Sequence, residues 1–503
     1  MVETICDWLR GSTLADDLST RVEDAVQAWS GRAWAEEVAG VAALLAAAGV
    51  RRGDRVAVLL PRGLEEVACI LGAMAVGAVA VPIHTRLKDE QVAHVLQDAA
   101  PRCCVVSAAR LLALQDPRES LAGVPHVDPG ARRRAPAGAS FCGDLRGADT
   151  AVILYTSGST GRAKGIVQTH ENLVAGARIV AGFLDLTPAD RLLSLLSLSF
   201  DYGLNQVLTA LASGCRLAVG DHLGAGELAL LLQRHRPTGL AGVPSFWHEA
   251  ARGLESGALT AADGASLRFV TNSGGKLQPA DSAVLRARWP GAEVFAMYGL
   301  TEAFRSAYLP PAELDEAPDS FGYAIEGVEL LLVDAHTGAV LRGPAEGELV
   351  HAGALVAQGY WNNPEATAAR FRRDPRGGDS RVVYSGDLVR RDARGRHFFV
   401  SRMDRMMKVH GHRVSPDEVS REVVGAPGVG RVAVFGVPDG ARGDRIAVFC
   451  EGEPGDPALA DRVRRRCRAR LPSYMQPSVV RVLARLPLNP NGKVDEAALR
   501  GML

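Results

Sequence analysis

The sequence predicts an α/β protein with a large N-terminal domain, residues 1–402, and a small α+β C-terminal domain, residues 403–503. In the first 300 or so residues, short apolar runs alternate with helical segments, which is typical of parallel sheets covered by helices. Between residues 320 and 400, short β-like runs are separated by Gly and Asp. We therefore expect two parallel-rich α/β subdomains, a small antiparallel β subdomain and a separate C-terminal unit.

The individual elements follow from apolar runs and from the turn residues between them. Residues 15–50 predict an amphipathic helix pair, and residues 128–147, rich in Pro, Gly, Ala and Arg, predict a surface linker. Strands are expected at 54–60, 78–83, 103–106, 192–197, 216–219, 239–243, 267–271, 328–333, 347–351, 382–384, 397–400, 432–437 and 445–450. Helices are expected at 64–77, 88–98, 203–212, 416–424 and 457–469.

Composition argues against several classes of protein. Lys+Arg and Asp+Glu both number 57, so neither a basic field for nucleic acid nor a polybasic tail for a membrane is expected. The longest apolar stretch, residues 38–50, is too short to cross a bilayer, and the first residues lack the basic segment of a secretory signal. Eight cysteines without Cys-x-x-Cys spacing predict reduced thiols. We expect a soluble, cytoplasmic protein.

The most informative segment follows an apolar run, Ala151 to Leu154, that predicts a buried strand. It reads Tyr155-Thr-Ser-Gly-Ser-Thr-Gly-Arg-Ala-Lys164-Gly165, and a helical segment is expected after it. Glycines let the backbone approach an oxyanion, hydroxyl groups donate hydrogen bonds, and Lys164 adds a positive charge. The spacing is not that of a Walker A loop, because residue 163 is alanine. The segment predicts phosphate binding, and a flexible Gly/Ser linker is the alternative.

This run resembles the phosphate-binding motif of the adenylate-forming superfamily, which contains acyl-CoA synthetases, adenylation domains of non-ribosomal peptide synthesis and firefly luciferase. Four further segments are similar to motifs of that family and follow in its order: Met297-Tyr-Gly-Leu-Thr-Glu302, Tyr384-Ser-Gly-Asp387, Ser401-Arg402 to Gly411, and Leu488-Asn-Pro-Asn-Gly-Lys493. Only the third departs from the pattern, with serine in place of its first glycine. The resemblance implies that a carboxylic acid and ATP form an acyl-adenylate and pyrophosphate, after which a thiol captures the acyl group.

The resemblance also implies roles for individual residues. Lys493, Thr301, Glu302 and His170 are the candidate catalytic residues, with a helix-capping role as the alternative for His170. Glu302 is expected to hold Mg²⁺, which prefers carboxylate oxygens. The residues expected to bind ATP are Thr156, Ser157, Gly158, Ser159, Thr160, Gly161, Lys164, Tyr298, Gly299, Thr301, Asp387 and Arg402. The C-terminal domain is expected to be mobile, with Asp404 as its hinge and Gly411 lining a tunnel for the thiol.

The identity of the acid is less defined. The expected pocket residues are Phe200, Asp201, Asn205, Asn272, Gly274, Gly275, Met297 and Arg305. Asp201 resembles the aspartate that holds the α-ammonium group of an amino acid in peptide synthetases, and capping of the helix that follows is an equal alternative. Arg305 either binds a substrate carboxylate or pairs with Asp201 and leaves the pocket uncharged.

We therefore predict an AMP-forming acid–thiol ligase, with an amino acid as substrate and a carrier-protein phosphopantetheine as acceptor. The alternative is an acyl-CoA synthetase for a medium or branched acid, such as the ligases found with exosortase systems, because these share the same motifs. A luciferase-like oxygenase and a non-catalytic nucleotide-binding scaffold are two further hypotheses. The complete set of motifs, including Lys493, argues against the scaffold.

Overall fold

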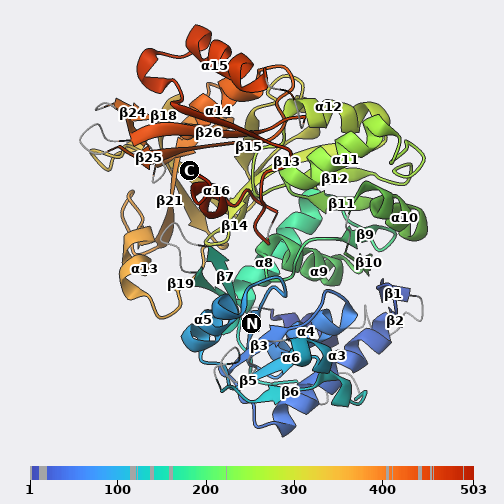
Figure 1. Ribbon diagram of the computed structural model, residues 1–503. Coiled ribbons are helices and arrows are strands. Elements are labelled where there is room, and N and C mark those ends of the chain that lie inside the picture. Colours follow the sequence, from blue (N-terminus) through green and yellow to red (C-terminus); the bar gives the residue numbers. More distant parts are fainter. Residues whose placement is uncertain are drawn as a thin grey trace. The chain divides into compact units, whose positions relative to one another are not determined.

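The computed structural model describes residues 3–10, 20–113, 121, 123–135, 141–157, 163–221, 224–403, 407–409, 412–439, 444–453, 456, 458–490 and 492–503. The chain divides into two compact units (Figure 1). The first unit comprises Met1–Leu330 and His351–Val383, and the second comprises Leu331–Val350 and Tyr384–Leu503. The chain passes between the units within β16 (Val328–Val333), β18 (Ala345–Gly353) and β21 (Arg381–Arg391).

One sheet of the first unit has the strand order β19-β8-β7-β4-β3-β5-β6. Its strands are β3 (Arg55–Leu59), β4 (Val79–Pro82), β5 (Cys103–Val106), β6 (His126–Val127), β7 (Thr150–Ser157), β8 (Ala163–Thr169) and β19 (Gly359–Tyr360). The pairs from β7 through β6 are parallel, whereas β8 is antiparallel to both β7 and β19. Its connecting helices are α4 (Leu64–Ala75), α5 (Asp89–Ala99) and α6 (Ala108–Ala113). This alternation confirms the predicted parallel-rich subdomain.

The other sheet of the first unit contains the strand order β15-β14-β13-β12-β11-β9-β10-β1-β2. Its strands are β1 (Thr20–Glu23), β2 (Ala28–Ser30), β9 (Arg191–Ser194), β10 (Arg216–Val219), β11 (Gly239–Gly242), β12 (Phe269–Asn272), β13 (Glu293–Leu300), β14 (Phe304–Leu309) and β15 (Ser320–Ala324). The pairs from β13 through β1 are parallel. The helices of this part are α8 (His170–Phe183), α9 (Asp201–Ser213), α10 (Ala225–His235), α11 (Pro244–Ser256) and α12 (Pro279–Arg288).

The predicted helix pair at 15–50 is wrong over residues 20–30. This segment forms the antiparallel pair β1–β2, with Val22 opposite Trp29, and both of these side chains are buried. Asp24 makes the turn by accepting hydrogen bonds from the backbone N–H groups of Val26 and Gln27, at 2.8 and 2.7 Å. Only one helix, α3 (Gly31–Ala47), follows, and the Ser30 hydroxyl caps it by accepting from the Ala33 N–H at 3.1 Å.

The prediction of a helix directly after the phosphate-loop segment is also wrong. Strand β8 comes first and pairs with β7, and α8 begins only at His170. The helix starts there because Thr169 caps it: its hydroxyl accepts from the Asn172 N–H at 3.2 Å, while the Asn172 side chain accepts from the Thr169 N–H at 3.1 Å. The predicted phosphate loop therefore connects two antiparallel strands.

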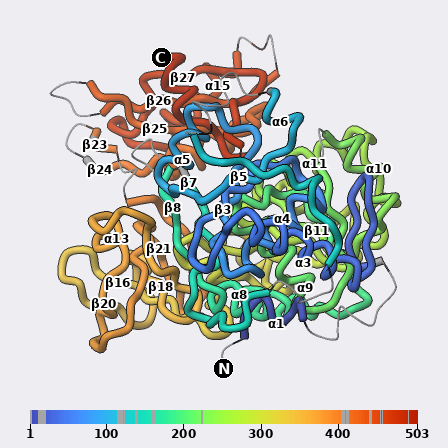
Figure 2. The backbone as a smooth tube through the Cα atoms, turned by 90° about the horizontal axis from the view of Figure 1, so that it is seen from below, coloured from blue at the N-terminus to red at the C-terminus, as the bar shows by residue number. Residues whose placement is uncertain are grey.

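Helices α3 and α4 lie side by side in the first unit (Figures 1 and 2). Gly72 permits this contact, because a Cβ atom at that position would lie 2.5 Å from a methyl group of Val41. The short helix α1 (Ile5–Arg10) packs on α4. Among the described residues, no helix combines the length and the apolar character needed to cross a lipid bilayer. All eight cysteines are free thiols in the structure, and seven of them are buried.

The second unit contains a three-stranded sheet and an antiparallel part. The three strands are β25 (Val432–Pro438), β26 (Asp444–Glu451) and β27 (Val479–Leu483), and the helices are α14 (Pro416–Val424), α15 (Leu459–Arg470) and α16 (Glu496–Arg500). The antiparallel part includes β17 (Val340–Leu341), β22 (His397–Arg402), and the pair β23 (Met407–Val409) and β24 (His412–Val414). Residues 384–402 belong to this unit, whereas the predicted boundary falls after 402; that boundary stays a prediction.

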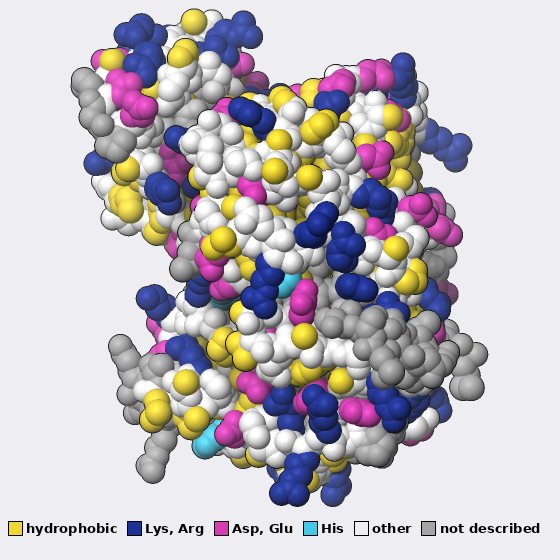
Figure 3. Space-filling view, turned by 90° about the vertical axis from the view of Figure 1, so that its right-hand side faces the viewer, with side chains coloured by type: hydrophobic (Ala, Val, Ile, Leu, Met, Phe, Trp, Pro, Cys, Tyr) yellow, Lys and Arg dark blue, Asp and Glu magenta, His cyan; other side chains and the backbone are white. Residues whose placement is uncertain are grey.

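Charge is spread over the surface. On the face shown in Figure 3, Lys and Arg side chains are interspersed with Asp and Glu and do not gather into one field. This distribution agrees with the balanced composition of the sequence.

Candidate active site

Strands β7 and β8 bring the two ends of the predicted phosphate loop together. Thr156 lies opposite Lys164, and Tyr155 lies opposite Gly165. Gly165 must be glycine, because a Cβ atom there would lie 2.7 Å from Ile153 and 2.9 Å from the Tyr155 ring. Ser157 ends β7. The predicted site residues Gly158, Ser159, Thr160, Gly161, Asp404 and Gly411 lie outside the described residues.

The segment Tyr298 to Glu302 spans the last three residues of β13 and the start of the turn to β14. Gly299 allows the close approach of β14, because a Cβ atom there would lie 2.1 Å from the Phe304 carbonyl oxygen. The Thr301 carbonyl accepts a hydrogen bond from the Gln168 side chain at 2.9 Å, which attaches the turn to β8. The Tyr298 ring stacks on Phe321, with 4.3 Å between centroids, so one face of this ring is already covered. Its predicted position beside adenine stays a prediction.

Tyr360 links two of the predicted groups. Its hydroxyl donates to Oε1 of Glu302 at 2.6 Å, and Nζ of Lys164 lies 5.4 Å from the centroid of its ring. The phosphate-loop lysine and the predicted metal ligand therefore contact the same aromatic side chain. Sequence reasoning missed Tyr360. The signal that could have found it is the run Gln358-Gly-Tyr-Trp-Asn-Asn, in which two aromatic residues stand among Gly and Asn outside any expected strand.

Hydrogen bonds join helix α9 to the end of β12 and to the β13–β14 turn, and these elements carry several of the predicted acid-binding residues. The Thr301 hydroxyl donates to Oδ1 of Asp201 at 3.4 Å. The Tyr202 hydroxyl bonds to Thr271, at 2.9 Å from its carbonyl oxygen and 2.6 Å from its hydroxyl, which ties α9 to β12. The Asn272 amide donates to the Gly275 carbonyl at 2.9 Å. Both Asp201 and Asn272 are buried.

Asp201 does not cap its helix, which corrects one of the two sequence interpretations. The N-cap of α9 is Phe200, whose side chain makes no capping hydrogen bond, and Asp201 is the first helical residue. Its carboxylate is directed to Thr301 instead. A negative charge in the first turn still interacts favourably with the helix dipole. Close packing holds this turn in place, because a Cβ atom on Gly203 would lie 2.0 Å from the Ser197 carbonyl oxygen.

His170 is fully buried at the start of α8, and neither ring nitrogen has a hydrogen-bond partner within the described part of the chain. It does not cap the helix, because Thr169 does. Burial lowers the pKa of His170 to about 4, and the nearby charge of Asp149 offsets only part of this effect. A catalytic role for His170 stays a prediction.

Acidification is expected to destabilise the protein through His170. An unfolded histidine has a pKa of about 6.5, so between pH 6.5 and pH 4 the unfolded chain binds a proton that the folded chain does not. The free energy of unfolding therefore falls as the pH drops from 6.5 to 4. Above pH 6.5 His170 does not change it. His170→Gln should remove a slope of about 1.4 kcal/mol per pH unit, measured as the difference in unfolding free energy between wild type and variant at pH 7, 6 and 5. The exposed His336→Gln is the control, and parallel curves for wild type and His170→Gln would contradict the expectation.

The remaining predicted residues lie in the second unit. Asp387 and Arg402 face each other across β21 and β22, and Nη1 of Arg402 lies 3.2 Å from Oδ1 of Asp387. Lys493 is exposed in a tight turn: the Asn489 N–H donates to its carbonyl at 2.7 Å, and its own N–H donates to the Asn489 side chain at 3.0 Å. Gly492, with φ of 73°, permits the turn.

Comparison with protein families gives two separate matches along the chain. The family model described as AMP-binding enzyme matches residues 16–361. The model described as AMP-binding enzyme C-terminal domain matches residues 418–493. Together these matches include most of the residues that the sequence singled out.

Several characterised proteins resemble the chain over most of its length. An L-proline–[L-prolyl-carrier protein] ligase of Streptomyces coelicolor is 31% identical over 494 residues, covering 91% of this chain and 89% of that protein. A long-chain-fatty-acid–CoA ligase of Mycobacterium tuberculosis is 30% identical over 469 residues, covering 91% and 90%. Other relatives are far longer: the chain spans 6% of a probable nonribosomal peptide synthetase of Salinispora arenicola, to which it is 34% identical over 492 residues.

The fold has close counterparts among solved structures. ATP-bound MatB from Rhodopseudomonas palustris superposes with a TM-score of 0.88 at 26% identity, covering 100% of this chain and 99% of that one. An anthranilate CoA ligase in complex with anthranoyl-AMP gives a TM-score of 0.86 at 25% identity, covering 100% and 97%. These similarities confirm the predicted fold class and the family resemblance.

Proposed function

The chain belongs to the AMP-binding enzyme family, and on this premise we propose that it activates a carboxylic acid with ATP and passes the acyl group to a thiol. In the first step a carboxylate oxygen attacks the α-phosphorus of ATP, and the bond to the β-phosphate breaks to release pyrophosphate. In the second step a thiolate sulfur attacks the acyl carbon, and AMP leaves with the bonding electrons. The ATP-bound structural neighbour supports the use of ATP.

The observation that carries this proposal is the cluster around Tyr360. Lys164 supplies a positive charge for phosphate oxygens and Glu302 supplies a carboxylate, and both contact Tyr360. One residue before Glu302, the Thr301 hydroxyl contacts Asp201 in the predicted acid pocket. On this proposal the phosphate end and the acid end of the first step would meet at Thr301 and Glu302, as attack of a carboxylate on a nucleotide requires.

The side chains around Glu302 are of the kinds that bind Mg²⁺ and phosphate. Mg²⁺ usually takes one or two carboxylate oxygens from the protein and the rest from phosphates and water. Glu302 provides such a carboxylate, and the Tyr360 hydroxyl bond orients it. When bound, the metal would neutralise phosphate charge as the new bond to phosphorus forms. Lys164 and Thr301 would hold phosphate oxygens beside it.

We infer further that the acid is an amino acid and that the acceptor is a carrier-protein phosphopantetheine. Asp201 is only 6% exposed and lies next to Thr301, so it can bind the ammonium group two bonds away from the reacting carboxylate. Similarity to a carrier-protein ligase supports this acceptor. The second candidate is an acyl-CoA synthetase, which the similarity to a fatty-acid–CoA ligase favours.

ATP–pyrophosphate exchange against amino acids, their deaminated analogues and short or branched fatty acids tests the proposal. We expect exchange with an amino acid and a loss of about 10²–10³-fold or more in kcat/KM in Asp201→Ala, because breaking a buried charge pair costs about 3–5 kcal/mol. Asp281→Ala is the matched control, since Asp281 is equally buried but hydrogen-bonded to His248. Equal exchange with the deaminated analogue, unaffected by Asp201→Ala, would favour the acyl-CoA synthetase.

A further inference from the structure

Arg305 is a buried cation without a carboxylate partner. It lies in β14 and is 2% exposed. Within the described part of the chain, no carboxylate oxygen lies within 4.0 Å of its guanidinium, and its Nε makes no hydrogen bond. The guanidinium stacks on Tyr202 at 4.2 Å from the ring centroid, and Nη1 lies 3.9 Å from the Met297 sulfur. These contacts place the charge beside α9 but do not neutralise it.

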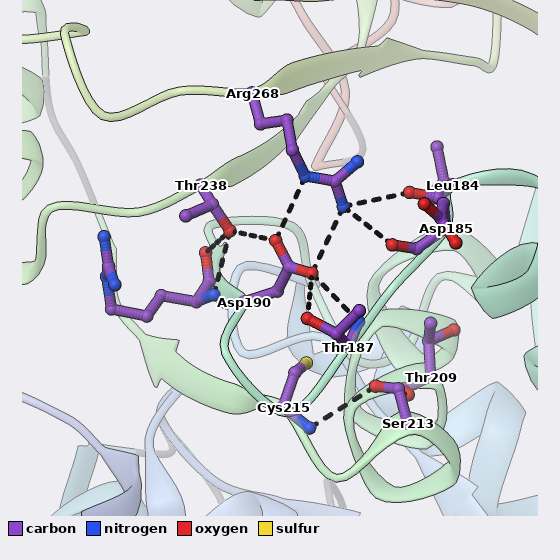
Figure 4. Close-up of polar contacts among 10 residues, drawn as sticks. Leu184, Asp185, Thr187, Asp190, Thr209, Ser213, Cys215, Thr238 and Arg268 are labelled. Atoms are coloured by element: carbon purple, nitrogen blue, oxygen red, sulfur yellow. Dashed lines mark hydrogen bonds and ion pairs between the residues drawn. The ribbon is translucent and has the colours of Figure 1, made fainter.

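The same unit shows how a structural arginine is satisfied. Arg268 donates from Nε and from Nη2 to Asp190, both at 3.2 Å (Figure 4). Its Nη2 also donates to the carbonyls of Leu184 and Asp185, at 3.0 and 3.1 Å. Arg268 is more exposed than Arg305 and yet has a carboxylate and two carbonyls as acceptors. Among the described residues, the more deeply buried of these two arginines is therefore the one that lacks an anion.

A further buried donor near Tyr202 has no partner among the described residues, namely the amide nitrogen of Asn205. Asn205 lies one helical turn after Asp201 and Tyr202, so it lies on their side of α9. Buried donors are normally satisfied. The unsatisfied donors of Arg305, which stacks on Tyr202, and of Asn205, one turn from Tyr202, therefore indicate a ligand.

We propose that the activated acid carries a second carboxylate on its side chain and that Arg305 binds this group through its Nε–H. This proposal deepens the proposed function and rests on it. The Asn205 amide donates to the same carboxylate, while Asp201 holds the α-ammonium group next to Thr301. The substrate class is thus an α-amino dicarboxylic acid.

The alternative is that Asp201 neutralises Arg305 and leaves an uncharged pocket. The two groups are not in contact, since Arg305 has no carboxylate within ion-pair distance in the described chain. Burial lowers the pKa of Arg305, and the Tyr202 hydroxyl and the charge of Asp201 oppose this only in part. An additional anion would therefore stabilise the guanidinium.

ATP–pyrophosphate exchange with aspartate, glutamate and 2-aminoadipate, each beside its side-chain amide, tests the proposal. For the wild type we expect one of the three acids to exceed its amide by about 100-fold in kcat/KM. In Arg305→Gln, kcat/KM for that acid should fall by about 100-fold, whereas kcat/KM for the amide should change by less than about threefold. Arg305→Lys should recover part of the loss in kcat/KM for the acid. Arg268→Gln, the matched control outside the pocket, should leave the acid-to-amide ratio unchanged.

Stability measurements separate binding from folding. Because Arg305 has no carboxylate partner among the residues that the structure describes, Arg305→Gln should unfold at the same temperature as the wild type or above it. Exchange only with acids that have neutral side chains, with the acid-to-amide ratio unchanged in Arg305→Gln, would overturn the inference and leave the proposed function standing. Absence of exchange with every acid would overturn both.

Discussion

Lys493→Ala is expected to lower acyl-adenylate formation by about 100-fold or more, while transfer of the acyl group from preformed adenylate to the thiol stays within about threefold. The reason is charge: an ammonium group that bridges the attacking carboxylate and the α-phosphate acts mainly in the first transition state, where negative charge grows. Removing one such preorganised donor costs about 10²–10³-fold in other enzymes. The turn that presents Lys493 is built by backbone bonds with Asn489 and is unaffected by the substitution.

Single-turnover rates of the two half-reactions, measured separately, check this expectation. Arg485→Ala is the matched control, because Arg485 is an exposed cation shortly before the same turn. The control should change neither rate. If Lys493→Ala slowed both half-reactions equally, the lysine would not be specific to the first step, and its role in adenylate formation alone would be wrong.

Glu302→Ala is expected to lower adenylation by about 10²–10³-fold and to raise the Mg²⁺ concentration needed for half-maximal rate. The carboxylate is the only group that the proposal assigns to the metal, so its removal leaves the phosphate charge without a bridge to the protein. Measuring exchange across a Mg²⁺ titration separates loss of metal binding from loss of fold.

Tyr360→Phe is the companion variant, because it removes the 2.6 Å hydrogen bond to Glu302 and keeps the ring beside Lys164. A loss of about 10-fold in the adenylation rate is expected, since a group that orients a metal ligand typically changes activity by about 10–100-fold.

Unchanged activity and unchanged Mg²⁺ dependence in Glu302→Ala would remove Glu302 as the metal ligand.

The local sequence pattern correctly predicted helices and strands that can be identified from a few consecutive residues. Strand β5 at Cys103–Val106 and helix α14 at Pro416–Val424 have the predicted bounds, because an apolar run of four residues or a Ser-Pro start needs no distant partner to be identified. Local pattern failed where pairing with a distant segment decided the outcome. Residues 20–23 are a strand because β10 provides a parallel partner nearly 200 residues later. Residues 163–169 are a strand because β7 and β19 flank them.

The sequence by itself determined the family, the α/β class and most of the candidate site residues, since these depend on residue types at short spacings. Only the tertiary structure decided what those side chains meet. It directed Asp201 to Thr301 instead of to the helix end and brought Tyr360 to Glu302 and Lys164. It also buried Arg305 against Tyr202, with no carboxylate partner among the described residues. The physical reason is that burial and charge compensation depend on contacts between segments about 60 to 200 residues apart, which no local pattern records.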